Sequence, residues 1–181
     1  MNPRHFQQSH LTLNVKRTPL DYLLYLPAKY ERETETRYPL ILFLHGSGER
    51  GSDLNLVRKY GLTKKIEKGV DFPFIVIAPQ CPAGSTWAFE LDSLNVLLNQ
   101  IVSFYRVDPK LLYLTGLSLG GNGTWCMAQR FPGQFAAIAP ICGRGTGRSM
   151  VSPLQDTPIW VFHGALDDVV PVTESEQMVQ Y

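Results

Sequence analysis

A serine between two glycines is the residue of this chain best suited to nucleophilic chemistry. The segment Gly116-Leu117-Ser118-Leu119-Gly120 has the pattern GxSxG, which raises a serine hydroxyl on a sharp turn between a strand and a helix. The pattern alone is weak evidence. Here, however, the apolar run 111–115 directly precedes it, and a segment long enough for a helix follows it. We therefore predict that Ser118 is a nucleophile on a strained turn.

A glycine-rich segment upstream could stabilise the charge that forms when a serine attacks a carbonyl group. His45-Gly46-Ser47-Gly48 follows the apolar run 39–44. Glycines let a loop turn its backbone N–H groups inward, and fixed N–H groups aimed at a developing oxyanion often supply a large part of the catalytic power. We expect His45 itself to stabilise this loop rather than to act as a base.

Two adjacent acids could assist the same chemistry. Asp167 and Asp168 lie in a polar segment that begins at His163, directly after the apolar run 159–162. A carboxylate there could orient a histidine base and stabilise its charged form. Acidic residues at strand ends also serve as helix caps, so this segment alone does not choose between the two aspartates.

Apolar runs separated by helical segments must position these residues. The runs are 39–44, 74–78, 111–115, 136–139 and 159–162. Runs without polar alternation indicate strands that are covered on both faces, as in a parallel sheet. Helical spacing is found over 91–105, which we expect Asp108-Pro109 to end, and a second helix is expected over 121–131. This alternation predicts an open α/β sheet with its site at the carboxyl ends of the strands.

The beginning of the chain has a different pattern. Residues 10–15 alternate between apolar and polar, and 21–26 are rich in leucine and tyrosine, with Pro19 between the two segments. Such a pair predicts an antiparallel hairpin. The first 13 residues contain no apolar signal-peptide region, and no stretch approaches the length of a membrane span. We therefore expect a cytoplasmic protein without a membrane span.

Composition excludes several other classes of function. The net charge of +1 implies no long-range electrostatic field, so no nucleic-acid partner is expected. The basic stretch 58–68 is interpreted as a solvated helix face. The three cysteines, Cys81, Cys126 and Cys142, lack the spacing of a zinc site, and their odd number argues against a secreted disulfide framework. We expect no metal ion and no cofactor.

On these residues the chain resembles the α/β-hydrolase superfamily. It is most similar to the phospholipase/carboxylesterase group and its relatives labelled predicted peptidases or feruloyl-type esterases. The resemblance extends from about residue 12 to the end of the chain. It rests on segments 44–51, 78–80, 116–121 and 163–171, together with Trp87.

The resemblance implies a fold and a set of roles. The fold is a single α/β-hydrolase domain over residues 1–181, a mostly parallel sheet with an N-terminal antiparallel hairpin. Ser118 corresponds to the nucleophile, Asp167 to the acid that orients a histidine, and the N–H groups of Ser47 and Leu119 to the oxyanion hole. Trp87 could line the substrate pocket or anchor a loop.

The chain departs from the family pattern at one point. The family's catalytic histidine comes after one more helix and one more strand, whereas this sequence stops at Tyr181, in a helix expected from Thr173. None of its four histidines follows Asp167. We therefore expect a domain that lacks the last strand and helix, little esterase activity, and self-association through the uncovered sheet edge.

The function expected from this resemblance is the hydrolysis of small carboxylic esters through an acyl-enzyme on Ser118. Three alternatives remain: a serine peptidase of related fold, an inactive truncated hydrolase or pseudoenzyme, and an acyltransferase.

Overall fold

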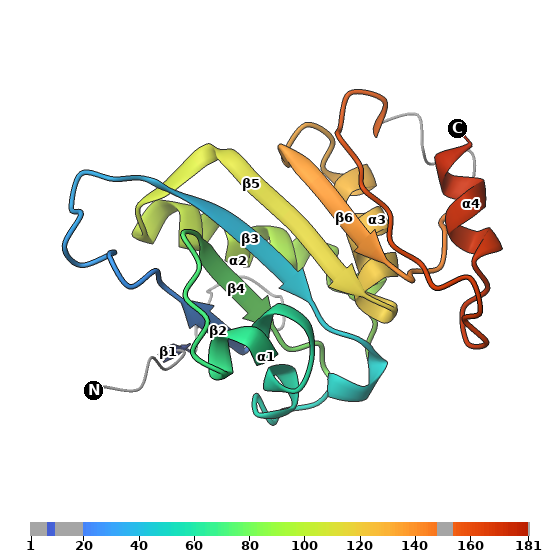
Figure 1. Ribbon diagram of the computed structural model, residues 1–181, viewed down its shortest axis with the longest axis horizontal. Helices are drawn as coiled ribbons and strands as arrows, with labels where there is room; N and C mark the ends of the chain where they lie inside the picture. Colours follow the sequence, from blue (N-terminus) through green and yellow to red (C-terminus); the bar gives the residue numbers. More distant parts are fainter. Residues whose placement is uncertain (1–6, 10–19, 148–153, 181) are drawn as a thin grey trace.

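The computed structural model describes residues 7–9, 20–147 and 154–180. Its framework is a six-stranded sheet within these residues, with the strand order β1-β2-β4-β3-β5-β6 (Figure 1). The strands are β1 (Gln7–Ser9), β2 (Tyr22–Tyr25), β3 (Tyr38–Leu44), β4 (Ile75–Pro79), β5 (Val107–Leu117) and β6 (Ala137–Ile141). Strands β4, β3, β5 and β6 run parallel, whereas β1 and β2 pair in antiparallel fashion.

Helices connect the parallel strands and cover both faces of the sheet. They are α1 (Gly61–Glu67), α2 (Leu91–Phe104), α3 (Leu119–Arg130) and α4 (Thr173–Val179), with short 3-10 turns η1 (Ser47–Glu49), η2 (Leu56–Arg58) and η3 (Trp87–Phe89). Helices α2 and α3 lie on one face and α1 lies on the other (Figure 1). This arrangement confirms the expected α/β-hydrolase fold. No described helix is both long and apolar enough to cross a membrane.

The two cores explain why the strands lack polar alternation. Leu40 and Leu42 of β3 pack toward α2 and α3, and Phe43 packs on the opposite face toward Ile66 of α1. All residues of β4 are buried. A strand with apolar neighbours on both faces needs apolar side chains at every position, and each fully buried leucine contributes roughly 1.5–3 kcal/mol.

Two local expectations differ from the structure. Helix α2 does not extend to Asp108-Pro109; it ends at Phe104, and Asp108 and Pro109 lie inside β5. The cause is strand pairing, because Val107 already aligns with Tyr38 of β3. The hairpin was expected between residues 10–15 and 21–26. Its second strand is found as β2, which pairs with Gln7–Ser9; residues 10–15 lie outside the described residues.

The apolar run 159–162 forms the outer edge of the sheet without becoming a complete strand. It contacts β6 through two isolated parallel bridges, Ile138 with Ile159 and Ile141 with Phe162. The Trp160 amide donates to the Ile138 carbonyl at 3.0 Å. Among the described residues, the amides of Ile159 and Val161 have no backbone acceptor.

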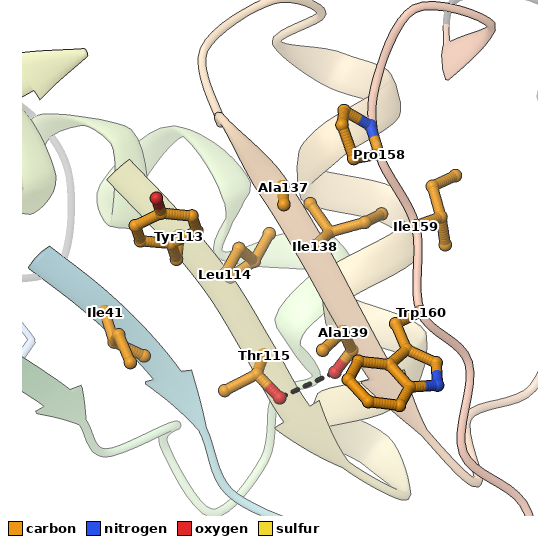
Figure 2. Close-up of a pocket in the computed structure, with 10 residues that line it drawn as sticks. All are labelled: Ile41, Tyr113, Leu114, Thr115, Ala137, Ile138, Ala139, Pro158, Ile159 and Trp160. Carbon is orange, nitrogen blue, oxygen red and sulfur yellow. Dashed lines mark hydrogen bonds between the residues drawn. The ribbon is translucent and has the colours of Figure 1, made fainter. Parts of the chain in front are cut away.

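An apolar cavity of about 440 Å³ lies beside this edge (Figure 2). Side chains of β3, β5 and β6 form its floor, among them Ile41 and Tyr113, and Trp160 lies on its rim. The cavity lies on the same face of the sheet as α1. Ile41, which lines the cavity, and Phe43, which packs under α1, are alternate residues of β3 and therefore point to the same face. None of the expected site residues lines it.

Candidate active site

Ser118 stands on the sharp turn between β5 and α3. Its backbone has φ 55° and ψ −110°, a region that costs a non-glycine residue of order 1–3 kcal/mol. Two hydrogen bonds hold this conformation: the Ser118 amide donates to the Ile141 carbonyl at 2.9 Å, and the Ser118 carbonyl accepts from the Asn122 amide at 3.0 Å. The strained strand-to-helix turn expected from the sequence is therefore confirmed.

The glycines on either side of Ser118 are required by close backbone contacts. A Cβ atom on Gly120 would lie 1.9 Å from the Leu44 carbonyl oxygen, and one on Gly116 would lie 2.4 Å from the Gly120 carbonyl oxygen. No side chain fits these distances, because the opposing atoms belong to the backbone. The two glycines thus let the first turn of α3 pack directly against the end of β3.

The glycine-rich loop after β3 lies against this turn. A Cβ atom built on Gly46 would come within 3.5 Å of the Leu117 carbonyl oxygen and 3.9 Å of Ser118 Cβ. Ser47 and Leu119 are the first residues of η1 and α3, positions whose amides have no acceptor inside the helix. Neither amide has a hydrogen-bond partner among the described residues. That the two amides converge on one point stays a prediction.

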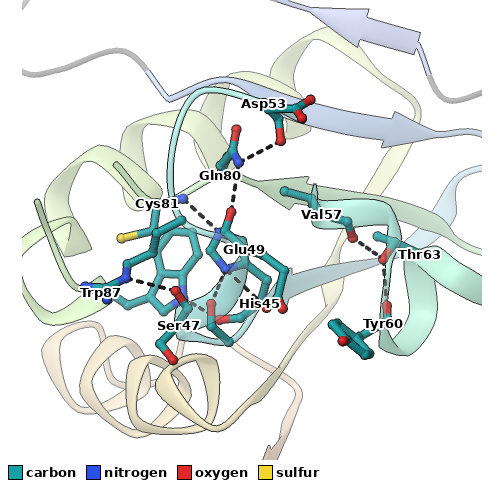
Figure 3. A network of polar contacts seen from close by, with 12 residues as sticks. His45, Ser47, Glu49, Asp53, Val57, Tyr60, Thr63, Gln80, Cys81 and Trp87 are labelled. Atoms are coloured by element: carbon teal, nitrogen blue, oxygen red, sulfur yellow. Dashed lines mark hydrogen bonds and ion pairs between the residues drawn. The ribbon is translucent and has the colours of Figure 1, made fainter. Parts of the chain in front are cut away.

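His45 is part of a buried polar network beneath this loop (Figure 3). Its Nε2 accepts a hydrogen bond from the Cys81 amide at 2.9 Å, and its Nδ1 lies 2.6 Å from the Gly46 carbonyl oxygen. Burial lowers the pKa of His45 to about 4. A neutral imidazole with both ring nitrogens engaged supports the loop and has no free nitrogen for Ser118.

Trp87 anchors the same loop. Its side chain is fully buried, its indole N–H donates to the His45 carbonyl at 2.9 Å, and its ring meets the His45 ring edge-on. A fully buried indole has no accessible surface to offer a substrate. This corrects the expectation that Trp87 lines the substrate pocket and favours the loop-anchoring alternative.

The depressed pKa of His45 predicts a loss of stability in acid. The unfolded chain binds a proton at the ordinary pKa of 6.5, whereas the folded chain resists it until about 4. The free energy of unfolding should therefore fall as the pH drops from 6.5 to 4, by about 3 kcal/mol from this group. Urea unfolding at pH 7 and pH 4.5 measures the change. His45→Asn should have a shallower pH slope, and an identical slope would contradict the prediction.

Asp167 and Asp168 differ clearly in the structure. Asp167 Oδ1 accepts hydrogen bonds from the Val170 amide at 2.9 Å and the Val169 amide at 3.0 Å, and these two amides lower the pKa of the Asp167 carboxyl. Asp168 is exposed. Of the two aspartates, Asp167 is therefore the one whose carboxylate is held in a defined orientation by backbone amides.

Cys142 links this carboxylate to the nucleophile turn. It follows β6 and has a positive φ of 40°. Burial and the charge of Asp167 raise the pKa of its thiol, while the Ser118 amide lowers it. The backbone geometry agrees: the Ser118 amide donates to the carbonyl of Ile141, and the amide of the next residue, Cys142, donates to the Phe162 carbonyl at 2.7 Å, so the nucleophile turn and the segment that leads into the acid loop meet at this end of the sheet. Nothing in the sequence pattern pointed to Cys142.

His163 is held beneath the acid loop. Its Nδ1 lies 2.7 Å from Ser175 Oγ and its Nε2 lies 2.7 Å from the Val170 carbonyl oxygen, while Asp167 Oδ2 is 3.6 Å from Nε2. This series of contacts has the composition of a catalytic triad, but Ser175 is only 4% exposed. We therefore assign it to the packing of α4. His5 and His10 lie outside the described residues.

Glu49 is a site residue to which the sequence assigned no role. It is 6% exposed and its Oε2 lies 3.8 Å from His45 Nδ1. The spacing from Gly46, which precedes η1, to Glu49 matches a capping box, in which the third helical residue binds the amide of the N-cap. This spacing is the sequence signal that could have identified Glu49 as part of the site. No cluster of described side chains could hold a metal ion.

Comparisons with known proteins agree with this geometry. Residues 16–174 match the family model named Esterase. A poly(3-hydroxyoctanoate) depolymerase of Pseudomonas fluorescens is 36% identical over 130 residues, which cover 60% of this chain and 47% of the depolymerase. A bifunctional acetylxylan esterase/xylanase of Neocallimastix patriciarum is 28% identical over 144 residues, 76% of this chain and 20% of that protein. The chain therefore spans half or less of the length of these relatives.

Solved structures give the same result. A thermostable esterase is similar with a TM-score of 0.84 and 33% identity, over 98% of this chain and 51% of the other. A ferulic acid esterase, at a TM-score of 0.72 and 18% identity, covers 97% of this chain and 83% of its own length and shows the fold alone. The family match and the α/β-hydrolase architecture around Ser118 show that this chain belongs to the Esterase family of α/β-hydrolases.

Proposed function

We propose that this chain hydrolyses carboxylic esters of small molecules through an acyl-enzyme on Ser118. The observation that carries the proposal is the backbone of Ser118, which is strained at φ 55° on the turn between β5 and α3. Such strain persists only where the surrounding structure enforces it, and it is common at active sites. The names of three similar proteins, an acetylxylan esterase, a poly(3-hydroxyoctanoate) depolymerase and a thermostable esterase, favour ester substrates.

The proposed mechanism gives each group one role. Ser118 Oγ bonds to the ester carbonyl carbon and gives its proton to an imidazole base. The carbonyl oxygen becomes an oxyanion and accepts hydrogen bonds from the amides of Ser47 and Leu119. The alcohol leaves with the proton from the imidazole, and water then hydrolyses the acyl-Ser118 ester. Asp167 orients the imidazole and stabilises its charged form.

The imidazole base lies outside the described residues in this proposal. His45 and His163 each use both ring nitrogens in contacts with other groups. An unassisted serine hydroxyl is a weak nucleophile at neutral pH. A serine hydrolase without one triad member keeps only about 10³–10⁴-fold acceleration over water. We therefore expect the 181-residue chain to turn over esters slowly.

Free imidazole tests both the reaction and the role of an imidazole as its base. p-Nitrophenyl acetate and butyrate are assayed with the 181-residue chain over a range of imidazole concentrations, beside peptide p-nitroanilides. We expect ester turnover that rises with imidazole above the rate of Ser118→Ala, which measures the reaction of imidazole alone. Cleavage of anilides as fast as esters would favour the peptidase alternative. Fast turnover without imidazole that is lost in His163→Ala would show that His163 is the base.

We also propose that two copies of the chain associate through the edge 159–162. The outward amides of Ile159 and Val161 have no backbone partner among the described residues, and Trp160 is 72% exposed. An unpaired apolar edge without charges favours strand pairing with an identical edge. Analytical ultracentrifugation should detect dimers that Trp160→Lys abolishes. Phe89→Lys, at an exposed aromatic of η3, is the control, and equal behaviour of both variants would reject the interface.

A further inference from the structure

The peptide between Gly46 and Ser47 is held by a histidine whose tautomer the structure defines. The Cys81 amide can only donate, so His45 Nε2, at 2.9 Å, must be its acceptor and carries no proton. The proton of the neutral ring is therefore on Nδ1, which donates to the Gly46 carbonyl at 2.6 Å. The ring is only 2% exposed, so water does not compete for either bond.

This hydrogen bond, together with the longer one that the Glu49 amide donates to the same carbonyl at 3.4 Å, fixes the direction of the next amide. A trans peptide is planar, and its C=O and N–H point in opposite directions. With the Gly46 carbonyl fixed toward His45, the Ser47 N–H points away from the ring. Gly46 itself lies against the nucleophile turn, since a Cβ atom on it would be 3.9 Å from Ser118 Cβ.

We propose that His45 is a positioning residue that aims the Ser47 N–H at the oxyanion formed when Ser118 attacks an ester. The proposal rests on the function proposed above and adds a residue to that site. His45 touches neither the substrate nor Ser118 in it. It acts through the Gly46–Ser47 peptide, and its effect is on the transition state in which the oxyanion forms.

Glu49 and the neighbouring loops hold the preceding peptide, between His45 and Gly46. Burial raises the pKa of the Glu49 carboxyl, and the Gly46 amide opposes that shift, as expected when the carboxylate caps this amide. Gln80 Nε2 donates to the Glu49 carbonyl at 2.8 Å, and the Trp87 indole donates to the His45 carbonyl at 2.9 Å (Figure 3). With its amide and its carbonyl both bound, the Gly46 unit cannot rotate independently.

Two substitutions of similar polarity separate positioning from simple loop stability. The side-chain amide of His45→Asn can reach the place of Nδ1 and donate to the Gly46 carbonyl, but it is too short to accept from Cys81. The longer side chain of His45→Gln can accept from the Cys81 amide at the place of Nε2, and it leaves the Gly46 carbonyl with only the longer hydrogen bond from the Glu49 amide, at 3.4 Å. Both variants lose one of the two hydrogen bonds, so a structural role predicts similar losses in each.

The experiment measures acylation of Ser118 at a fixed imidazole concentration, with p-nitrophenyl butyrate and with a fluorophosphonate. We expect His45→Gln to lower kcat and the labelling rate constant about 10- to 100-fold with little change in KM. His45→Asn should lose less than about 3-fold although its Tm falls by a similar amount. Equal losses of kcat in the two variants at equal Tm would overturn the proposal.

Nuclear magnetic resonance provides a readout that does not depend on turnover. We expect the ¹⁵N shifts of His45 to show the proton on Nδ1 at pH 7. The Ser47 amide resonance should move in His45→Gln and stay close to wild type in His45→Asn. A proton on Nε2, or an unmoved Ser47 amide, would overturn the positioning role. If the wild-type chain forms no adduct on Ser118 while these shifts are as expected, the proposed function fails and the peptide geometry stands.

Discussion

Ser118→Ala is expected to abolish labelling by a fluorophosphonate and to reduce imidazole-supported ester turnover to the rate of imidazole alone. The covalent path depends entirely on the Ser118 hydroxyl, and loss of the nucleophile in a complete serine protease costs about 10⁶-fold in kcat. The substitution should leave the fold intact. The turn is held by backbone hydrogen bonds to Ile141 and Asn122, and these do not involve the hydroxyl. Intact-protein mass spectrometry detects the adduct.

Ser175→Ala is the matched control for this experiment. Ser175 Oγ lies 2.7 Å from His163 Nδ1, so it is the described serine whose contacts most resemble an activated nucleophile. Its burial should keep it from reacting, and the variant should label like the wild type. Labelling that persists in Ser118→Ala and disappears in Ser175→Ala would show that the nucleophile has been misassigned.

Ser47→Pro is expected to lower the rate of Ser118 acylation by about 10²–10³-fold, the usual effect of removing one oxyanion-hole donor. Proline has no N–H, so the substitution deletes the donor proposed for the oxyanion. The backbone should accept it. Ser47 is the first residue of η1, where proline is favoured, and Gly46 has the extended φ −78° and ψ −177° that a residue before proline adopts.

Ser47→Ala separates the amide from the hydroxyl. It keeps the N–H and removes only an exposed side chain, so its rate constant should remain far above that of Ser47→Pro. Circular dichroism and Tm check that both variants fold. If Ser47→Pro folds and acylates like Ser47→Ala, the Ser47 amide is not an oxyanion donor, and the donor must be sought elsewhere in the loop.

Local patterns in the sequence were sufficient for the framework of this site. The apolar run 111–115, the glycines around Ser118 and the helix-length segment after it predicted a strained turn, and the structure has that turn with φ 55°. Such patterns are readable because they depend on a few neighbouring residues: uninterrupted apolar runs for buried strands, and glycine where backbones touch. The helix predicted over 91–105 is correct to within one residue, because the spacing of apolar residues in a helix is also a local pattern.

The boundaries of these elements depended on pairing partners instead. Asp108-Pro109 is a sound local stop signal for a helix, yet the chain leaves α2 earlier because Val107 pairs with Tyr38 of β3. The run 159–162 has the composition of a complete strand but contacts β6 through two bridges only. Sheet pairing joins segments that are distant in sequence, and no local window contains both partners.

The sequence by itself therefore determined the nucleophile turn, the strands that carry the site loops and the family resemblance. The tertiary structure decided which side chains hold those loops. His45 meets Cys81 and Trp87 across intervals of 36 and 42 residues, and the Ser118 amide meets the Ile141 carbonyl of β6. These contacts exist because parallel strands bring their carboxyl ends to one edge of the sheet, so residues from distant segments become neighbours only after the strand order is set.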